Sequence, residues 1–151
     1  QRCCCDGQSP VVAASLGSSK RALDSAIRYG LQRTAFGEKI TSFQLIQAKI
    51  ADSQADIYAM ECMLRDAASK LDQGLDIRLE AACVKMFASE ACGRIVDRVV
   101  QIYGGAGYIQ DYDAERFFRD SRLYRIFEGT TEIMQLVIAR TVLQEYEKGL
   151  N

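Results

Sequence analysis

An apolar stripe that repeats every seven residues limits what this chain can fold into more than any other feature. The stripe consists of Phe43, Ile50, Ile57, Leu64 and Leu71. Three further apolar residues each lie three positions after a residue of this stripe: Ile46, Met60 and Ala67. This spacing keeps the apolar side chains on one face of an α-helix. It predicts a helix over residues 43–72 that ends near Gly74, because glycine is favoured just beyond a helix C-terminus.

Two other segments carry apolar residues at helical spacing. The later one contains Val84, Phe87, Ala91, Ile95, Val99 and Ile102. The earlier one contains Leu23, Ile27 and Leu31. We expect further helices over residues 15–33, 77–103 and 131–147, with a short one over residues 114–125.

The succession of helical patterns, with no alternating strand pattern between them, decides the predicted fold class. The chain is expected to be all-α, as an up-and-down four-helix bundle with a short extra helix before the last long helix. Pro10 is the only proline. We expect residues 1–9 to form an irregular N-terminal segment and residues 10–151 to form one helical domain.

Charge and composition exclude several classes of function. The chain has 19 basic and 20 acidic residues among 151, so we expect neither nucleic acid nor an anionic membrane surface as a partner. No apolar run approaches the roughly 20 residues that span a bilayer. The chain has no histidine, which excludes Ser-His-Asp and Cys-His nucleophilic catalysis. Acid–base chemistry is left to carboxylates, tyrosine or lysine.

The six cysteines favour a reduced protein over a disulfide or metal site. Cys3, Cys4 and Cys5 are adjacent, which is a poor arrangement for bridging one another. A zinc site would need paired C-x-x-C spacing or histidines, so no metal is expected. The other three cysteines fall among apolar neighbours in helical patterns: Cys62, Cys83 and Cys92. We expect these to be buried, reduced thiols in a reducing compartment.

A lone carboxylate beside a glycine lies between the last two helical patterns. Glu128 and Gly129 precede the pattern that begins near Thr131. Gly129 permits a turn with positive φ and the close approach of a ligand to the backbone. Two interpretations of Glu128 are open. It is a proton-abstracting base, or it is one of the acidic residues that are common at helix N-termini.

Two earlier helix breaks contain residues suited to binding. In the first, the Arg33 guanidinium suits phosphate, Phe36 offers a flat apolar face, and Gly37 gives room for close approach. The second break covers residues 101–108 and is rich in glycine. Its glycines follow a helix, whereas those of the dinucleotide-binding fingerprint follow a strand and open a helix. A Rossmann fold is therefore rejected.

Three motifs in these breaks carry a family resemblance. They read R-x-x-F-G, Q-I-x-G-G-x-G-Y and R-D-x-x-x-x-x-I-[YF]-E-G-T, and they lie at residues 33–37, 101–108 and 119–130. In this order they resemble the C-terminal helical domain of the acyl-CoA dehydrogenases. The resemblance extends over about residues 10–148. We expect the N-terminal helical domain and the middle β-domain of that family to be absent from this chain.

The resemblance implies that Glu128 is the base that removes the α-proton of a straight-chain acyl-CoA thioester, while a hydride leaves the β-carbon for FAD. It implies substrate contacts at Tyr124 and Gly129. The implied FAD-binding residues are Arg33, Ala35, Phe36, Gln44, Gln101, Gly104, Gly105, Thr130 and Glu132. Those of the two earlier breaks resemble surfaces that hold the FAD of a neighbouring subunit, which implies a homodimer or a homotetramer.

The resemblance also implies the setting of the reaction. The expected electron acceptor is electron-transferring flavoprotein or a similar protein, and the expected process is fatty acid β-oxidation. The location would be the mitochondrial matrix in a eukaryote or the cytoplasm in a bacterium. The fragment by itself is expected to be inactive, because the other domains supply half of the flavin and acyl pocket. The alternative is a truncated, non-catalytic helical module for oligomerisation or interaction.

Overall fold

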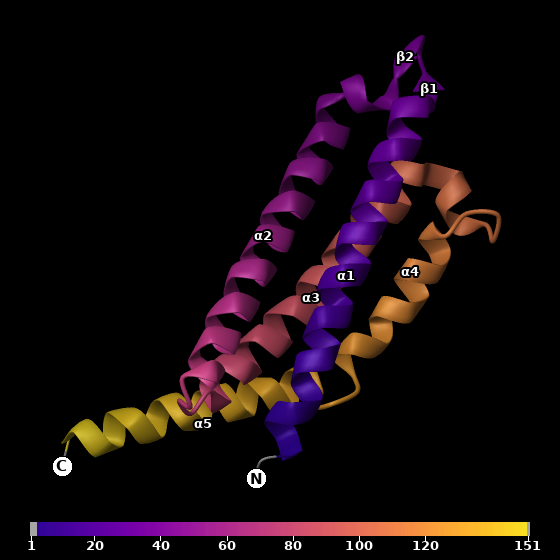
Figure 1. The fold of residues 1–151 in the computed structure, drawn as a ribbon. Helices are drawn as coiled ribbons and strands as arrows, with labels where there is room; N and C mark the ends of the chain where they lie inside the picture. Colours follow the sequence, from indigo (N-terminus) through magenta and orange to yellow (C-terminus); the bar gives the residue numbers. More distant parts are fainter. Residues whose placement is uncertain (1–2, 151) are drawn as a thin grey trace.

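Three long helices run side by side and form the body of the protein (Figure 1). The computed structural model describes the backbone of residues 3–150 and the side chains of residues 10–150. Helix α1 comprises Cys3–Gln32, α2 comprises Gln44–Asp72 and α3 comprises Arg78–Tyr103. They alternate in direction, so that α1 and α3 point the same way and α2 runs against both. The predicted all-α class is confirmed.

Helix α3 lies at the centre of the core, because it contacts α1, α2, α4 and α5. Its buried stripe includes five residues that are exposed by 1% or less: Ala91, Cys92, Ile95, Val96 and Val99. The stripe predicted for α2 is buried in its middle at Ile57 and Met60, whereas Leu71 near its end is 52% exposed. Burial of these facing stripes supplies the main stabilisation of the bundle.

The N-terminal part of α1 differs from the expectation. Residues 3–9, expected to be irregular, belong to α1, which begins at Cys3 and passes through Pro10; residues 1–2 lie outside the described part. A proline inside a helix removes one backbone hydrogen bond and adds a steric clash. Val11 and Val12 directly after it are 5% and 3% exposed. Their burial offsets part of that cost, so the helix continues where the sequence pattern suggested a boundary.

A small hairpin connects α1 to α2. Strands β1 (Thr34–Ala35) and β2 (Glu38–Lys39) pair antiparallel, and the 3-10 helix η1 (Ile40–Ser42) follows them. Phe36 and Gly37 form the two-residue loop with φ values of 54° and 84°. Two consecutive positive φ values suit the twist of such a hairpin. The break predicted at Phe36-Gly37 is therefore a tight turn that carries its aromatic ring at the tip.

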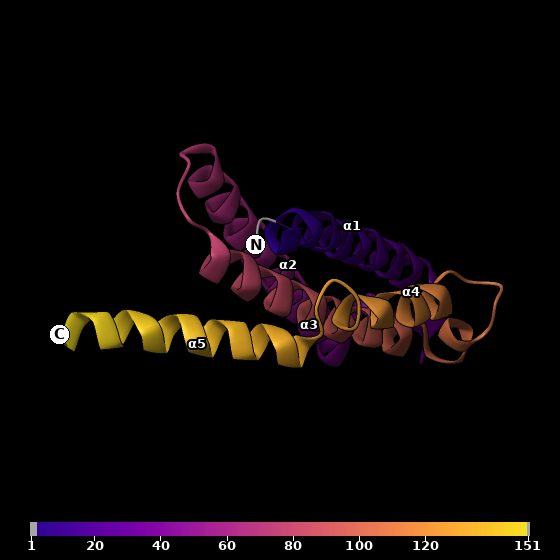
Figure 2. The ribbon, with the colours of Figure 1, turned by 90° about the horizontal axis from the view of Figure 1, so that it is seen from below.

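Of the last two helices, the first packs along the body and the second extends past it. After the 3-10 helix η2 (Gly104–Tyr108), helix α4 (Ala114–Ser121) returns along α3 and α1 and continues as the 3-10 helix η3 (Arg122–Arg125). Helix α5 (Thr131–Leu150) contacts α3 near its own start and then extends past the other helices (Figure 2). The short extra helix before the last long helix is thus confirmed. Met134 is the buried residue of α5, and most of its other apolar side chains are exposed.

The cysteines with described side chains are all free thiols. Cys92 is buried and Cys83 is half-buried, and burial raises the pKa of both thiols. Cys62 is exposed, contrary to the expectation, because it lies on the solvent side of α2 next to the stripe residues. Within the described part of the chain, no helix is long and apolar enough to cross a membrane, and no cluster of side chains is suited to a metal ion.

Candidate active site

The turn between η3 and α5 presents Glu128 to solvent. Glu128 and Gly129 both have left-handed backbone conformations, with φ values of 53° and 97°. Such a conformation is uncommon for a glutamate. The side chain of Glu128 is exposed, and it has no hydrogen bond or ion pair with another described residue. A carboxylate without an internal hydrogen bond or ion pair is available to a bound molecule.

Gly129 is fixed from two sides. A Cβ atom added at this position would lie 2.5 Å from Cε of Met134, the buried residue of α5. On the other side, the carbonyl oxygen of Gly129 accepts a hydrogen bond from the ammonium of Lys85 on α3. The positive φ favours glycine here, whereas the Met134 methyl is the far end of a flexible side chain that can shift. The glycine therefore allows the turn to pass tightly between α3 and α5.

Tyr124 lies in η3, just before the turn. Its ring stacks on that of Phe127, with 5.8 Å between the ring centroids. Its hydroxyl is 3.0 Å from Oγ of Ser18 on α1. These contacts hold an aromatic side chain close to Glu128. The structure thus brings together the predicted base and the two predicted substrate-binding residues, Tyr124 and Gly129, on one short segment.

Thr130 directly precedes α5, and Glu132 lies in its first turn. The Thr130 hydroxyl accepts a 3.3 Å hydrogen bond from the backbone N–H of Ile133, so Thr130 caps the helix. Hydrogen bonds from its own backbone N–H and from the Thr130 side chain lower the pKa of the exposed Glu132 carboxyl. An ionised Glu132 is also favoured by the helix N-terminus. Both residues lie beside Glu128, where the resemblance implied contacts with the flavin.

A polar hollow of about 180 Å³ adjoins this turn. Its lining residues are Glu90, Arg122, Arg125, Ile126, Thr130, Thr131 and Glu132. Glu90 of α3 accepts a 2.7 Å hydrogen bond from Oγ1 of Thr131 and one of 3.4 Å from Arg125. Nε of Arg125 is buried and has no hydrogen-bond partner among the described residues. The hollow is therefore lined by charged side chains.

Lys85 and Glu90 contact the turn from α3. Neither residue was predicted from the sequence. A signal for Lys85 is present, because it falls at helical spacing with Ala88, Cys92 and Val96 and is thus a charged residue on an apolar stripe. No comparable signal marks Glu90. Its partner Thr131 is 41 residues away in the chain, and only the tertiary structure brings the two together.

The other predicted cofactor-binding residues lie at the opposite end of α3. Gln101, Gly104 and Gly105 are exposed where α3 passes into η2, and Gly104 has a φ of 61°. Arg33, Ala35, Phe36 and Gln44 lie on the hairpin and at the first residue of α2. The ring of Tyr29 in the last turns of α1 stacks on that of Tyr103 at 4.2 Å between centroids, which joins the two segments at one end of the bundle.

These predicted cofactor-binding residues are called the hairpin group, and the group is free for a ligand. It consists of Arg33, Ala35, Phe36, Gln44, Gln101, Gly104 and Gly105. Phe36 is 97% exposed, with a T-shaped contact to Phe43 at 6.2 Å between centroids. The Arg33 guanidinium is exposed and forms no ion pair with any described residue. A Cβ added at Gly105 would meet no atom within 4 Å, so the backbone there is open to close approach.

The two groups of predicted site residues are far apart within one chain. Glu90 touches the Glu128 turn, and from Glu90 to Gly104 the axis of α3 covers roughly 20 Å at about 1.5 Å per residue. The structure therefore unites Tyr124, Glu128 and the start of α5 in one place, and it leaves the hairpin group at another. The role of the hairpin group in a neighbouring subunit stays a prediction.

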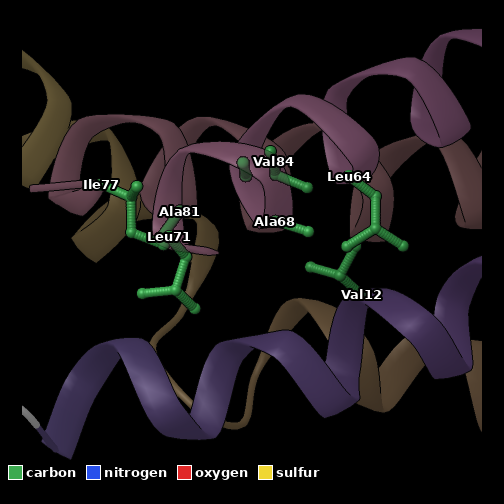
Figure 3. A pocket seen from close by; sticks show the side chains of 8 residues that line it. Val12, Leu64, Ala68, Leu71, Ile77, Ala81 and Val84 are labelled. Atoms are coloured by element: carbon green, nitrogen blue, oxygen red, sulfur yellow. The ribbon is translucent and has the colours of Figure 1, made fainter. Parts of the chain in front are cut away.

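Two further cavities lie away from Glu128. One of about 130 Å³ between α1, α2 and α3 is lined by aliphatic side chains, of which Figure 3 shows Val12, Leu64 and Leu71 pointing toward the space. The other, of about 510 Å³, lies between the end of α3 and α4 and includes Tyr108, Phe118 and Arg119. The first offers no side chain for acid–base chemistry. Neither includes a residue of the Glu128 turn.

Comparisons with known proteins match nearly the whole chain. Residues 8–143 match the family model for the acyl-CoA dehydrogenase C-terminal domain. The chain is 40% identical over 139 residues to the caffeyl-CoA reductase-Etf complex subunit CarC of Acetobacterium woodii, covering 92% of this chain and 37% of that protein. It is 39% identical over 140 residues to the mitochondrial short-chain specific acyl-CoA dehydrogenase of Bos taurus, covering 93% of this chain and 34% of that protein.

Solved structures give the same result. The butyryl-CoA dehydrogenase of Megasphaera elsdenii matches the fold with a TM-score of 0.90 at 35% sequence identity, over 93% of this chain and 37% of that one. The chain thus spans little more than a third of the length of these relatives. The matched segment includes all three motifs and the Glu128 turn. This chain belongs to the acyl-CoA dehydrogenase family, whose C-terminal domain it matches.

Proposed function

We propose that this chain supplies the catalytic base and part of the FAD site of a flavin-dependent acyl-CoA dehydrogenase. The reaction is the α,β-dehydrogenation of a straight-chain acyl-CoA thioester. One observation carries the proposal. Glu128, at the motif position of the family base, has a free and exposed carboxylate on a turn that is held between α3 and α5.

Glu128 performs two parts of the chemistry. Its carboxylate takes the proton from the α-carbon of the thioester. Its backbone N–H makes no hydrogen bond with a described carbonyl, so it is free to bind the thioester carbonyl oxygen and to stabilise the developing enolate. Tyr124 and Gly129 line the space next to the carboxylate and orient the acyl group. When bound, FAD supplies the acceptor for the hydride of the β-carbon.

The residues assigned to FAD suit its chemistry. Arg33 offers a guanidinium without an internal partner, which suits a pyrophosphate. Phe36 offers an exposed aromatic face for a planar ring, and Gly104 and Gly105 leave the backbone open. Thr130 and Glu132 would lie near the flavin of the chain's own subunit. The distance between these groups supports a site shared by two subunits, and hence a homodimer or a homotetramer.

The relatives support a CoA thioester as the substrate and a flavoprotein as the electron partner. They include a mitochondrial short-chain acyl-CoA dehydrogenase and a subunit of a caffeyl-CoA reductase-Etf complex. We assign electron-transferring flavoprotein, or a similar acceptor, as the partner of this protein. Fatty acid β-oxidation is the assigned process, in the mitochondrial matrix of a eukaryote or in the cytoplasm of a bacterium.

A non-catalytic helical module is the second candidate. Helix α5 extends beyond the body and exposes apolar side chains that include Leu136, Leu143 and Tyr146. A chain with this function would associate through α5 without binding flavin. Titration of the purified 151-residue chain with FAD, followed by absorbance of bound flavin, separates this candidate from a half-site that retains affinity for the cofactor.

The proposed reaction is tested by joining this chain to the remaining domains of a relative and measuring flavin reduction by butyryl-CoA in a stopped-flow instrument. Glu128→Gln should slow the reduction by orders of magnitude while the FAD content is retained, because the change removes the proton acceptor and leaves the cofactor contacts. Arg33→Ala should instead lower the FAD content. Glu145→Gln, an exposed carboxylate on α5, is the control. A wild-type rate in Glu128→Gln contradicts the proposal. The 151-residue chain alone should show no dehydrogenase activity.

A further inference from the structure

Lys85 is a lysine inside the protein core. It lies on α3 with 1% of its surface exposed, and lysine is almost never fully buried unless its charge is paired. Its ammonium donates a hydrogen bond to the carbonyl oxygen of Gly129, the residue directly after Glu128. It forms no ion pair with a carboxylate of the described residues. The hydrogen bond that satisfies this buried cation is therefore made to the backbone of the turn.

The charges around Lys85 all come from the same site. Burial lowers the pKa of Lys85, whereas the charges of Glu90, Glu128 and Glu132 act in the opposite direction. Glu90 lies on α3 itself, and the other two carboxylates lie on the turn and in the first helical turn of α5. The acidic groups that act on the charge of Lys85 thus belong to the candidate active site.

The backbone at Glu128 needs support. A left-handed conformation is unfavourable for an ordinary residue, and Glu128 adopts one directly before Gly129, which also has a positive φ. Its side chain makes no internal hydrogen bond that could hold the conformation. The backbone therefore sets the point from which the Glu128 side chain leaves the turn, and the contacts of the neighbouring residues hold that backbone.

Helix α3 provides those contacts on both sides of Glu128. Glu90 holds Arg125 before the turn and Thr131 after it, through hydrogen bonds of 3.4 Å and 2.7 Å. Lys85 holds the turn itself through the carbonyl of Gly129. Of these contacts, the one from Lys85 is nearest in sequence to Glu128.

We propose that Lys85 is a positioning residue for Glu128, which it orients through the carbonyl oxygen of Gly129. The role in catalysis rests on the proposed function of Glu128 as the base. Lys85 does not touch the substrate. It keeps the Glu128–Gly129 pair in its left-handed conformation, so that the carboxylate faces outward instead of folding back toward α3. The hydrogen bond between Lys85 and Gly129 is tested on the 151-residue chain without cofactor or substrate.

The first measurement is made on the wild-type chain by NMR, with labelled lysine nitrogen and labelled glycine carbonyl carbon. The Lys85 ammonium should exchange its protons with water more slowly than the other lysines and should correlate with the Gly129 carbonyl carbon. An ammonium that exchanges as fast as that of Lys39, which lies on the exposed strand β2, would overturn the proposal. This measurement needs no variant, so it stands even where a substitution prevents folding.

The second measurement compares Lys85→Met with Lys70→Met by amide hydrogen exchange. Lys85→Met removes the charge and the donor and keeps an unbranched side chain. The amides of Phe127 in the turn and of Ile133 and Met134 in the first turn of α5 should exchange about tenfold faster or more, while that of Ile95 in the core keeps its protection. Lys70→Met, which removes surface ion pairs, should leave the turn unchanged. An equal increase at all amides, or no increase in the turn, would overturn the proposal.

The catalytic part is tested in the assembled flavoprotein. Lys85→Met should lower the limiting rate of flavin reduction at saturating acyl-CoA at least tenfold, with FAD content and apparent substrate affinity unchanged. A wild-type limiting rate would contradict the role of Lys85 in positioning the base. If Glu128→Gln also reacts at the wild-type rate, the proposed base is wrong, and the exchange data still decide whether Lys85 anchors the turn.

Discussion

Oγ1 of Thr131 donates a 2.7 Å hydrogen bond to the carboxylate of Glu90 and thereby ties the start of α5 to the middle of α3. Removal of the hydroxyl in Thr131→Val should lower the free energy of unfolding by about 1–2 kcal/mol, because a half-buried carboxylate loses one of its two donors. Urea denaturation measures this change. Thr141→Val is the matched control, because its hydroxyl bonds only to the backbone carbonyl of Val137 within α5. If Thr141→Val lowered the free energy of unfolding as much as Thr131→Val does, the hydrogen bond between Thr131 and Glu90 would have no stabilising role in the tertiary structure.

Asp56 of α2 gives stability that depends on pH. Burial alone would raise the pKa of its carboxyl, but hydrogen bonds and charges from Arg94 and Arg98 on α3 outweigh this effect and bring the pKa below its ordinary value of 3.8. The folded protein therefore binds this proton only at lower pH than the unfolded chain does. The contribution is complete above pH about 4 and is lost as the pH falls through the folded pKa.

Asp56→Asn should accordingly lower the free energy of unfolding by about 1–3 kcal/mol at pH 7. The difference from the wild type should shrink in denaturation experiments as the pH falls below about 4. Asp66→Asn removes an exposed ion pair with Lys70 and should change the free energy of unfolding much less than Asp56→Asn does. A difference for Asp56→Asn that stays constant down to pH 2 would show that the ion pairs do not stabilise the fold.

Two glycines should respond to alanine in opposite directions. Gly129→Ala places a Cβ at positive φ and 2.5 Å from Cε of Met134, and it should destabilise the protein by about 1–2 kcal/mol. Gly17→Ala lies inside α1, where a Cβ meets no atom within 4 Å, and it should stabilise by about 0.5–1 kcal/mol. Thermal unfolding of both variants checks the signs. A stabilising Gly129→Ala would mean that the turn does not have this conformation in solution.

The sequence predicted the long helices well, because their apolar stripes depend on local spacing. The stripes of α2 and α3 fixed both helices to within one residue at each end. The start of α1 was predicted at residue 15, whereas the helix begins at Cys3. The apolar pattern gave no sign that Val11 and Val12, directly after Pro10, would be buried. The tertiary packing of two small hydrophobic residues outweighed a local preference there.

The sequence predicted which residues form the turn of the candidate site. It did not predict which residues of other helices contact that turn. Glu128 and Gly129 stand together in the sequence, so the turn could be found from them. The contacts of Lys85 and Glu90 with that turn span 44 and 41 residues, and no local pattern encodes them. Nor does the sequence reveal that α5 extends past the body, because its apolar spacing is the same whether it covers its own bundle or a second chain.

Self-association through α5 is the next expectation. Leu136, Leu143 and Leu150 follow one another at intervals of seven residues and are 50%, 62% and 86% exposed. Burial of such a stripe against a second copy is favourable. Sedimentation equilibrium at micromolar concentration should show a dimer or a tetramer, and Leu143→Lys should shift it toward the monomer. A wild-type chain that is monomeric throughout would contradict the association.

The central claim, that Glu128 removes the α-proton, is tested most directly by exchange of that proton with solvent. The assembled flavoprotein is incubated in deuterium oxide with an acyl-CoA thioester that has no hydrogen on its β-carbon, so that proton removal occurs without hydride transfer. Proton NMR then follows the α-signal. The wild-type protein and Glu145→Gln should exchange the α-proton at the same rate, and Glu128→Gln should lose this exchange by orders of magnitude while keeping its FAD. Exchange in Glu128→Gln at the wild-type rate would contradict the claim.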